Sequence, residues 1–214
     1  MTRILLVRHG ESEANKRDIF AGHLDVKLTE KGLEQAKLTA EYVAANYKVD
    51  KVYGSDLQRA FVTGKTIADR LGLDITPTKE MREVKAGKWD GMVFDDIVKV
   101  YPEDFNCWTT DIGKARCTDG ESVVELAERV MKELNRIADE NEGKTVLVAS
   151  HATPIRVAVT SVKYDGDITL MNAVPWVSNA SVSVIEKDEG EWRIVSLSED
   201  KHLASLRTAL PDNV

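Results

Sequence analysis

Two histidines and two arginines of this sequence are placed where a folded chain could gather them around an anion. His9, with Arg8 beside it, and His151 each directly follow a short apolar run of the kind that forms a buried strand. Arg59 comes shortly after a third such run, and Asn15 adds an uncharged donor near His9. A single histidine after a strand is more often structural, but buried guanidinium groups are costly without an anion. A phosphate group would satisfy both arginines.

The elements that would position these residues begin as strands alternating with helices. A strand is predicted at residues 3–7, in which residues 4–7 are all apolar, and it ends at Arg8-His9-Gly10, as expected of a central strand that ends in a tight turn. Thr29 is a good N-cap for a helix whose apolar positions recur at helical spacing as far as Tyr47. The next elements predicted are a strand at residues 49–53, a helix at residues 56–71 stopped by Gly72, and a strand at residues 73–76.

The second half of the chain repeats the alternation and ends in a hairpin. Ser122 and Glu125 form a capping box that opens a long helix, and residues 145–149 form a buried strand. Residues 180–186 and 192–197 alternate between apolar and polar side chains and are joined by a turn. We therefore expect an α/β fold, a three-layer α/β/α sandwich with a mostly parallel central sheet and an edge hairpin. Ligands bind beyond the carboxyl ends of such strands, so His9 and His151 are expected to share one crevice.

The domain organisation expected is a single domain over residues 1–214. The stretch at about 79–120 is less regular and contains Trp89 and Trp108, so we interpret it as a cap or lid excursion from that domain. Trp89, Phe94 and Trp108 are expected to pack within this lid rather than to contact substrate.

Composition and charge exclude several classes of function. The 214 residues are 43% hydrophobic and 30% charged, which is typical of a globular protein and not of a disordered one. The net charge of -7 disfavours binding to nucleic acid or to anionic membranes, and residues 4–7 are too short an apolar run for a signal peptide or a membrane span. A cytoplasmic location is predicted, with Cys107 and Cys117 as free thiols and a disulfide as the minor alternative. The oligomeric state is left unknown.

Motifs along nearly the whole chain resemble one family. The stretch LLVRHGES at residues 5–12 is followed in order by Asn15, by Phe20-Ala21-Gly22, by a segment at residues 55–63 that contains Arg59, by Arg82-Glu83, and by Ser150-His151. Together these motifs resemble the histidine phosphatase superfamily, the phosphoglycerate mutase-like enzymes. One departure is Ala152, since the family commonly has glycine after the second histidine, and the added methyl group could crowd the phosphate.

The resemblance implies a role for each matching residue. His9 would be the nucleophile that takes the phosphoryl group of a phosphomonoester, and water would later hydrolyse the phosphohistidine. A neutral imidazole is a competent nucleophile near pH 7, and Arg8 and Arg59 can neutralise the phosphoryl oxygens during transfer. The other implied contacts to the substrate are a donor on His151 and the substrate-binding positions Arg8, Asn15, Ala21, Gly22, Arg59 and Ala152.

Glu83 occupies the position that the family uses for the general acid. A carboxyl group can protonate a leaving alkoxide near neutral pH only if its pKa is raised, which burial under a lid and a nearby phosphate dianion would both do. Glu11 is interpreted as a residue that orients Arg8 or a histidine. His23 and His202 are expected to be structural or lid residues.

The sequence therefore predicts a metal-independent phosphomonoester hydrolase that acts on a small phosphorylated metabolite without a cofactor. No glycine-rich nucleotide loop is present, and the strand ends carry Arg and Asn where a binuclear metal site would need Asp and His. Two alternatives stay open: a cofactor-dependent phosphoglycerate mutase and a non-catalytic phosphoester-binding protein on the same fold. The mutase is disfavoured by the short segment at residues 84–121, although Lys114 and Arg116 could hold a second acidic group.

Overall fold

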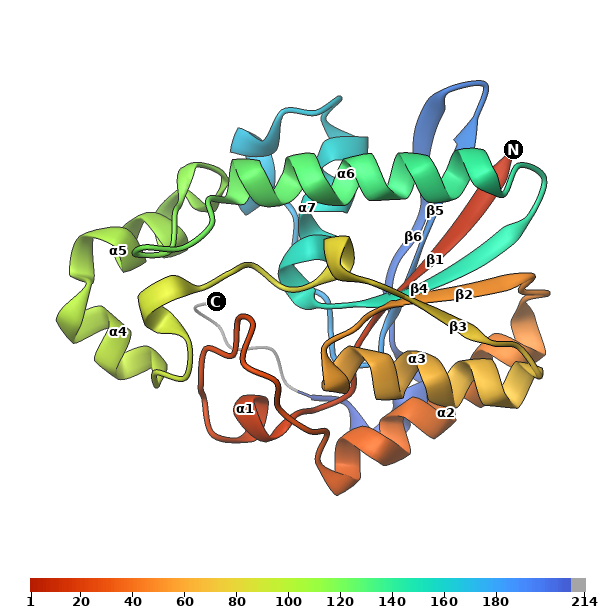
Figure 1. Cartoon of the computed structure of the whole chain (residues 1–214), viewed down its shortest axis with the longest axis horizontal. Helices are drawn as coiled ribbons and strands as arrows, with labels where there is room; N and C mark the ends of the chain where they lie inside the picture. The colour runs from red at the N-terminus through yellow and green to blue at the C-terminus, as the bar shows by residue number, and fades with distance from the viewer. Residues whose placement is uncertain (209–214) are drawn as a thin grey trace.

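The computed structural model describes residues 1–208, and within them six strands form one sheet in the order β3-β2-β4-β1-β5-β6 (Figure 1). The four strands from β3 to β1 are parallel, whereas β5 runs antiparallel to β1 and pairs with β6 at the edge. The predicted mostly parallel sheet with an edge hairpin is confirmed. The strands are β1 (Thr2–Arg8), β2 (Lys51–Ser55), β3 (Ile75–Thr78), β4 (Thr145–Ser150), β5 (Val182–Asp188) and β6 (Glu191–Glu199).

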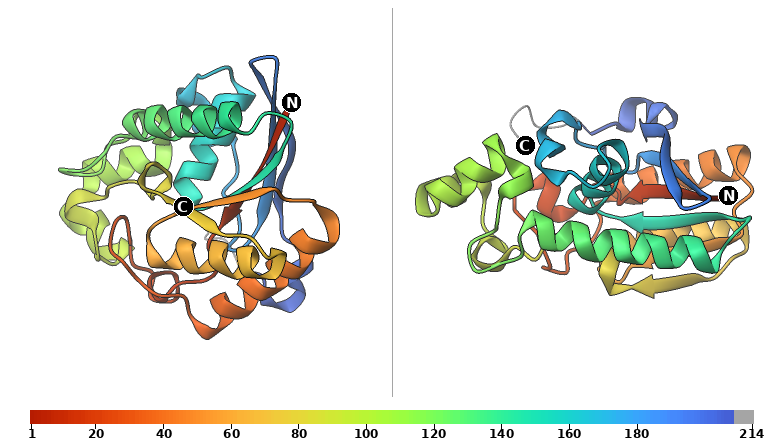
Figure 2. Two further views of the ribbon diagram at one scale, coloured as in Figure 1. Left: turned by 45° about the vertical axis from the view of Figure 1, so that its right-hand side comes forward. Right: turned by 90° about the horizontal axis from the view of Figure 1, so that it is seen from above.

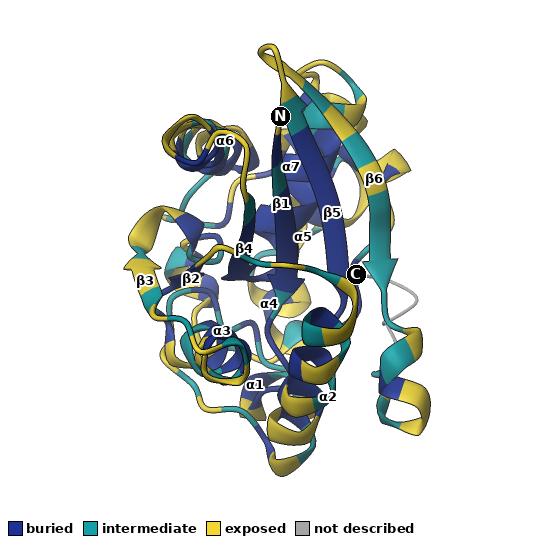
Figure 3. Ribbon diagram, turned by 90° about the vertical axis from the view of Figure 1, so that its right-hand side faces the viewer, coloured by how far each residue is buried: buried dark blue, intermediate teal, exposed yellow. Residues whose placement is uncertain are grey.

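Helices cover both faces of the sheet, as the three-layer prediction requires (Figures 1 and 2). Alternate residues of β1 divide between two hydrophobic clusters: Leu5 and Val7 pack with α2 (Glu30–Asn46) and α3 (Gln58–Leu71). Ile4 and Leu6 pack on the other face with α6 (Val123–Glu140) and α7 (Ala152–Lys163). The central strands are consequently buried on both sides (Figure 3).

Local capping signals set the ends of these helices as predicted. Thr29 Oγ1 accepts a hydrogen bond of 3.0 Å from the Gly32 N–H at the start of α2. Ser122 and Glu125 form the reciprocal capping box that opens α6. Gly72 ends α3 in the left-handed conformation, with φ of 70°, where a side chain would add strain.

A crevice is expected where the chain leaves two neighbouring strands toward opposite faces of the sheet. After β1 the chain passes through the short α1 (Glu13–Lys16) to α2, and after β4 it enters α7 on the other face. The His9 N–H donates to the Ser150 carbonyl at 3.0 Å, which joins the two strand ends. His9 and His151 therefore lie side by side, with ring centroids 5.2 Å apart.

The segment between β3 and α6 extends beyond the carboxyl ends of the strands (Figure 1). It contains α4 (Phe94–Val100), α5 (Pro102–Thr110) and the short 3-10 helices η1 (Lys79–Met81), η2 (Gly87–Trp89) and η3 (Ile112–Lys114). Its tryptophans pack against Phe20 from the first half of the chain, at centroid distances of 5.4 Å for Trp89 and 5.3 Å for Trp108.

Several elements differ from the sequence prediction. The strands β2, β3 and β5 each begin and end two residues later than predicted, and α3 begins two residues later. Helix α7, in which residues 152–160 are all buried, was not predicted. The remaining 3-10 helices are η4 (Ile168–Ala173) and η5 (Lys201–Leu206). None of the helices described is both long and apolar enough to cross a membrane.

Candidate active site

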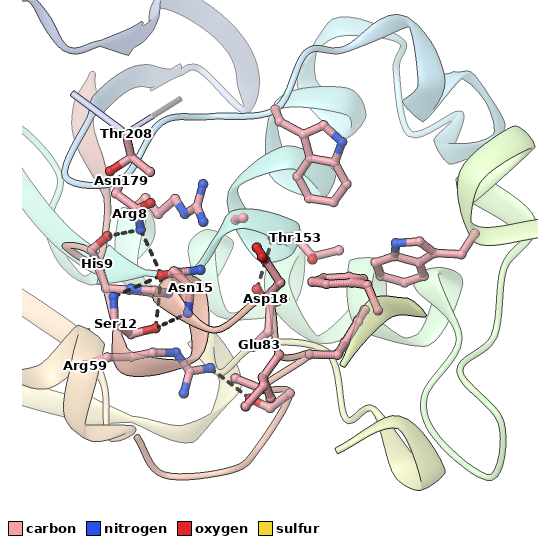
Figure 4. Close-up of a pocket in the computed structure, with 18 residues that line it drawn as sticks. Arg8, His9, Ser12, Asn15, Asp18, Arg59, Glu83, Thr153, Asn179 and Thr208 are labelled. Carbon is pink, nitrogen blue, oxygen red and sulfur yellow. Dashed lines mark hydrogen bonds between the residues drawn. The ribbon is translucent and has the colours of Figure 1, made fainter. Parts of the chain in front are cut away.

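A cavity of about 180 Å³ lies beyond the carboxyl ends of β1 and β4 (Figure 4). His151 does not line it, but lies directly behind His9 and is completely buried. The cavity brings together all the other residues predicted for the site, namely Arg8, His9, Asn15, Ala21, Gly22, Arg59, Glu83 and Ala152.

The ring of His9 is held in one tautomer. Its Nδ1 lies 2.7 Å from the Gly10 carbonyl oxygen, which can only accept, so Nδ1 carries the proton and Nε2 keeps its lone pair. Burial of the ring lowers the pKa of His9 well below 6.5, and the positive charges of Arg59 and Arg8 lower it further. The imidazole is therefore neutral and nucleophilic at neutral pH.

Two guanidinium groups, that of the half-buried Arg8 and that of the buried Arg59, make the cavity positive. Arg8 Nη1 donates to the Val177 carbonyl at 2.6 Å, and its buried Nε has no partner among the residues described. Arg59 is held by the loop opposite, because Nη2 donates to the Gly22 carbonyl at 2.8 Å and Nη1 to the Leu24 carbonyl at 2.9 Å. Burial lowers the pKa of each arginine to about 10, so both stay charged at pH 7.

The amide of Asn15 is oriented by its neighbours. Its Oδ1 accepts hydrogen bonds from Ser12 N at 3.1 Å, from Ser12 Oγ at 2.9 Å and from Asn179 Nδ2 at 3.3 Å. With the oxygen so engaged, the Nδ2 group is left as a donor toward the cavity that Asn15 lines. Asn179 also donates to the His9 carbonyl at 3.1 Å, so it supports two site residues at once.

The second histidine is oriented by Ser55 at the end of β2. His151 Nε2 lies 2.8 Å from Ser55 Oγ, and the Leu57 N–H donates to that same oxygen at 3.3 Å. The hydroxyl proton of Ser55 is thus available to Nε2, which leaves the ring proton on Nδ1. This Nδ1 is buried and has no partner within the described chain. Burial lowers the pKa of His151 well below 6.5, and the charge of Arg59 lowers it further.

Glu83 approaches the cavity from the segment after β3 (Figure 4). Its Oε1 accepts from the Val84 N–H at 2.8 Å, and its Oε2 lies 3.4 Å from the Thr153 N–H. The Glu83 backbone carbonyl accepts from Arg129 Nη2 at 2.8 Å and lies 2.9 Å from His23 Nε2. Contacts to its carboxyl group and to its backbone carbonyl therefore hold Glu83 at the cavity wall.

The first turn of α7 also faces the cavity, through Ala152 and Thr153. The positive end of the dipole of this 12-residue helix favours a bound anion, although the Thr153 N–H lies 3.4 Å from Glu83 Oε2 and Pro154 has no N–H. Ala152 belongs to the hydrophobic cluster on the α6 and α7 face of the sheet.

Some sequence interpretations of individual side chains were wrong. Glu11 does not orient Arg8 or a histidine: its Oε1 accepts from Thr29 Oγ1 at 2.9 Å and its Oε2 pairs with Lys31 at 3.2 Å. Trp89 is completely buried, but Phe94 and Trp108, which were expected to pack only within the lid, line the cavity.

Several residues of the site were not identified from sequence. They include Ser55, which orients His151, and Arg129, which holds the backbone at Glu83. Asp18 and Trp176 line the cavity from segments with no recognisable motif. Across residues 1–208, no group of three or more His, Cys, Asp or Glu side chains is placed to hold a metal ion.

This chain is similar to known proteins both in sequence and in structure. The model of the histidine phosphatase superfamily (branch 1) matches residues 4–200. Phosphoserine phosphatase 1 of Hydrogenobacter thermophilus is 33% identical over 203 residues, which cover 95% of each chain. Phosphoglycerate mutase-like protein 4 of Arabidopsis thaliana is 32% identical, over 94% of this chain and 86% of its own. Among solved structures, Bacillus stearothermophilus YhfR is 26% identical and superposes with a TM-score of 0.89 over 95% of this chain and 100% of its own.

Proposed function

The chain belongs to branch 1 of the histidine phosphatase superfamily, and from this membership we propose that it hydrolyses phosphomonoesters of a small metabolite through a phosphohistidine on His9. The observation that carries the proposal is the neutral His9 ring, whose free Nε2 lies in a cavity with two charged guanidinium groups. A nucleophile beside a site for a dianion is the arrangement that phosphoryl transfer needs.

In the first step, His9 Nε2 attacks phosphorus and the bond from phosphorus to the ester oxygen breaks. Arg8 and Arg59 neutralise the phosphoryl oxygens, and the Nδ2 donor of Asn15 binds them as the transition state forms. The leaving alkoxide takes a proton from Glu83, which makes the departing product a neutral alcohol. His9 does not need to lose a proton, because Nδ1–H stays bonded to the Gly10 carbonyl.

In the second step, water attacks phosphorus and the bond from phosphorus to Nε2 breaks. The Glu83 carboxylate left by the first step accepts a proton from the attacking water, which restores the acid for the next cycle. Inorganic phosphate leaves, and His9 returns to its neutral tautomer. We further propose that the segment at residues 79–120 acts as the cap of the cavity, and that the protein works in the cytoplasm.

The proposal is tested by trapping the intermediate. Brief incubation with a ³²P-labelled phosphomonoester, followed by quenching without acid, should leave label that is stable to base and lost in acid. The His9→Ala protein should carry no label and should not turn over 4-nitrophenyl phosphate. Label retained on that variant would assign the nucleophile to another residue.

A second measurement tests independence of metal ions. Hydrolysis of 4-nitrophenyl phosphate should survive exhaustive treatment with EDTA. Complete loss of activity with EDTA, restored by a divalent cation, would contradict the proposed mechanism.

A further inference from the structure

The cavity has a second end that the phosphate chemistry does not use. Besides Arg8 and Arg59, its wall includes the partly exposed rings of Phe94 and Trp176, Ile19, and the carboxyl groups of Glu83 and Asp18. In Figure 4, Asp18 lies on the side of Glu83 and Thr153, across from Arg8 and His9. The alcohol part of a bound phosphomonoester must occupy this end.

The backbone of Asp18 is fixed while its carboxylate is free. Asp18 adopts the left-handed conformation with φ of 51°, which aspartate tolerates better than most residues. Its N–H donates to the Asn15 carbonyl at 3.3 Å, and its own carbonyl accepts from the Phe94 N–H at 3.1 Å. Within residues 1–208, its carboxylate makes no hydrogen bond or ion pair, so a charge in the substrate can pair with it.

Once a phosphate is bound, the charge of Asp18 has no opposite charge to pair with on the described part of the cavity wall. The two negative charges of a phosphate dianion balance Arg8 and Arg59, and Asp18 is left without a counter-charge. No other lysine or arginine among the described residues lines the cavity, and residues 209–214 contain neither in the sequence. Lys16 and Arg17 precede Asp18 but do not line the cavity. A carboxylate at this end would therefore meet a like charge.

The aromatic rings at this end suit a cation. Aromatic faces attract alkylammonium groups, and rings beside a carboxylate are a common arrangement for binding them. The indole of Trp176 is held by Arg156, whose guanidinium lies 4.3 Å from the ring centroid and donates to the carbonyls of Val174 and Met171. Arg156 itself does not line the cavity.

Building on the proposed phosphatase activity, we propose that the preferred substrate is the phosphomonoester of a small amino alcohol, with an ammonium group and no carboxylate. The ammonium group pairs with Asp18 and lies against Phe94 and Trp176 while the phosphate occupies the site of Arg8 and Arg59. This specificity would distinguish the chain from enzymes that act on acidic phosphoesters such as phosphoglycerates.

The test compares two esters that differ in charge and hardly in shape. Phosphocholine and its carbon analogue, 3,3-dimethylbutyl phosphate, are assayed for kcat/KM, with 3-phosphoglycerate as the acidic ester. We expect phosphocholine to exceed the carbon analogue by roughly fivefold to tenfold, as cation–π and ion-pair contacts in a partly exposed site allow. The acidic ester should be the poorest of the three.

The variant that tests the residue is Asp18→Asn, since asparagine keeps the shape and accepts the left-handed backbone. It should bring the ratio of phosphocholine to the carbon analogue close to one. The matched control is Asp165→Asn, at an exposed aspartate with φ of 49° outside the cavity, and should leave that ratio unchanged.

Binding to the His9→Ala protein, measured by calorimetry, gives the same comparison without turnover. Equal binding and turnover of the two esters, or preference for the acidic ester, would overturn the proposed specificity. Failure to hydrolyse any ester, while His9→Ala still binds phosphocholine more tightly than its carbon analogue, would contradict the phosphatase activity and leave the cation site standing.

Discussion

At the scale of single residues, one backbone carbonyl decides which nitrogen of His9 can attack. The Gly10 oxygen holds the proton on Nδ1, so the lone pair on Nε2 needs no general base to expose it. In the proposed mechanism the task left for acid–base chemistry is the leaving group, and of the two carboxyl groups that line the cavity, Glu83 and Asp18, we assign it to Glu83. The proposed chemistry is thus divided between a nucleophile fixed by the backbone and an acid fixed by a separate segment.

The first prediction concerns Glu83→Gln. Because an alkoxide leaves slowly without a proton, kcat for an alkyl phosphate should fall by roughly 10²- to 10³-fold, the usual contribution of a general acid. For 4-nitrophenyl phosphate, whose leaving group departs unprotonated, the loss should be less than about tenfold. Steady-state rates on both esters check this. Equal losses on the two esters would show that Glu83 is not the acid.

The second prediction concerns the charge of His9 as pH falls. Burial, reinforced by Arg59 and Arg8, lowers the pKa of His9, so its ring should stay neutral from pH 8 down through 6.5. Ring ¹³C or ¹⁵N shifts of labelled histidine, assigned with His9→Ala, would follow this directly. A titration of His9 centred near 6.5 would contradict it.

The lowered pKa of His9 also makes the free energy of unfolding depend on pH. In the unfolded chain the ring is exposed and binds a proton below pH 6.5, whereas the folded protein does not, so the free energy of unfolding falls as pH decreases from 6.5. Each such histidine contributes a slope of about 1.4 kcal/mol per pH unit in this range. His151, whose pKa is lowered in the same direction, adds to it.

Most of the residues that we propose as catalytic could be predicted from sequence because their motifs lie at the ends of predicted strands, as Arg8-His9 and Ser150-His151 do. Asp18 could not, since an exposed aspartate after Lys16 and Arg17 looks like any solvated turn. Its proposed role depends on the cavity that it lines together with Phe94 and Trp176. Such a neighbourhood depends on tertiary contacts that no local pattern encodes.

At the scale of elements, α6 does more than cover the sheet. Arg129 projects from it to the start of the segment that follows β3, where its guanidinium donates to the carbonyls of Glu80, Arg82 and Glu83. Glu121 pairs with the same guanidinium at 2.6 Å and keeps it in place. The position of the proposed acid therefore depends on a helix that does not itself line the cavity.

The third prediction is that Arg129→Met lowers catalysis by displacing Glu83. We expect kcat for an alkyl phosphate to fall by about tenfold or more, with a much smaller effect on 4-nitrophenyl phosphate, as for partial loss of the acid. The control is Arg136→Met on the same helix, which loses ion pairs to Glu133 and Glu140 but no contact to Glu83. Thermal melts separate this effect from simple destabilisation, and equal losses on both esters would contradict a positioning role.

The elements that sequence predicts well are those with a local signal, such as α6 with its capping box and α3 with its terminal Gly72. Helix α7 gives no such signal because both its faces are buried, between the sheet and the segment around η4. The close approach of Gly10 to Gly32 is also invisible in sequence: a Cβ on Gly10 would lie 2.4 Å from the Gly32 carbonyl. Only the folded chain shows that this contact presses the loop after β1 onto α2.

At the scale of the whole molecule, an acidic chain holds a locally basic cavity. The chain carries a net charge of -7, while the half-buried Arg8 at the end of β1 and the buried Arg59 at the start of α3 both line the cavity. A small dianion gains from this focused charge, whereas an extended polyanion would meet the acidic surface around it. The same distribution of charge affects whether the phosphohistidine is hydrolysed by water or returns its phosphoryl group to a bound product.

The fourth prediction separates a phosphatase from a phosphoglycerate mutase, which could share His9, both arginines and Glu83. A mutase must grip the carboxylate of its bound product while the product reorients, and it must keep water from the phosphohistidine. The basic residues of the segment at 84–121 do not line the cavity, and four of them, Lys88, Lys99, Lys114 and Arg116, pair with acidic neighbours instead.

The charged group that does line the far end is Asp18, which would repel a carboxylate. We therefore expect 3-phosphoglycerate, incubated with a catalytic amount of 2,3-bisphosphoglycerate, to give slow release of phosphate or no reaction. Phosphate release and formation of 2-phosphoglycerate are followed in the same samples, with His9→Ala as the blank. If 2-phosphoglycerate appeared much faster than phosphate, water would have to be excluded from the phosphoenzyme. The protein would then be a mutase, although no lysine or arginine other than Arg8 and Arg59 lines the described part of the cavity.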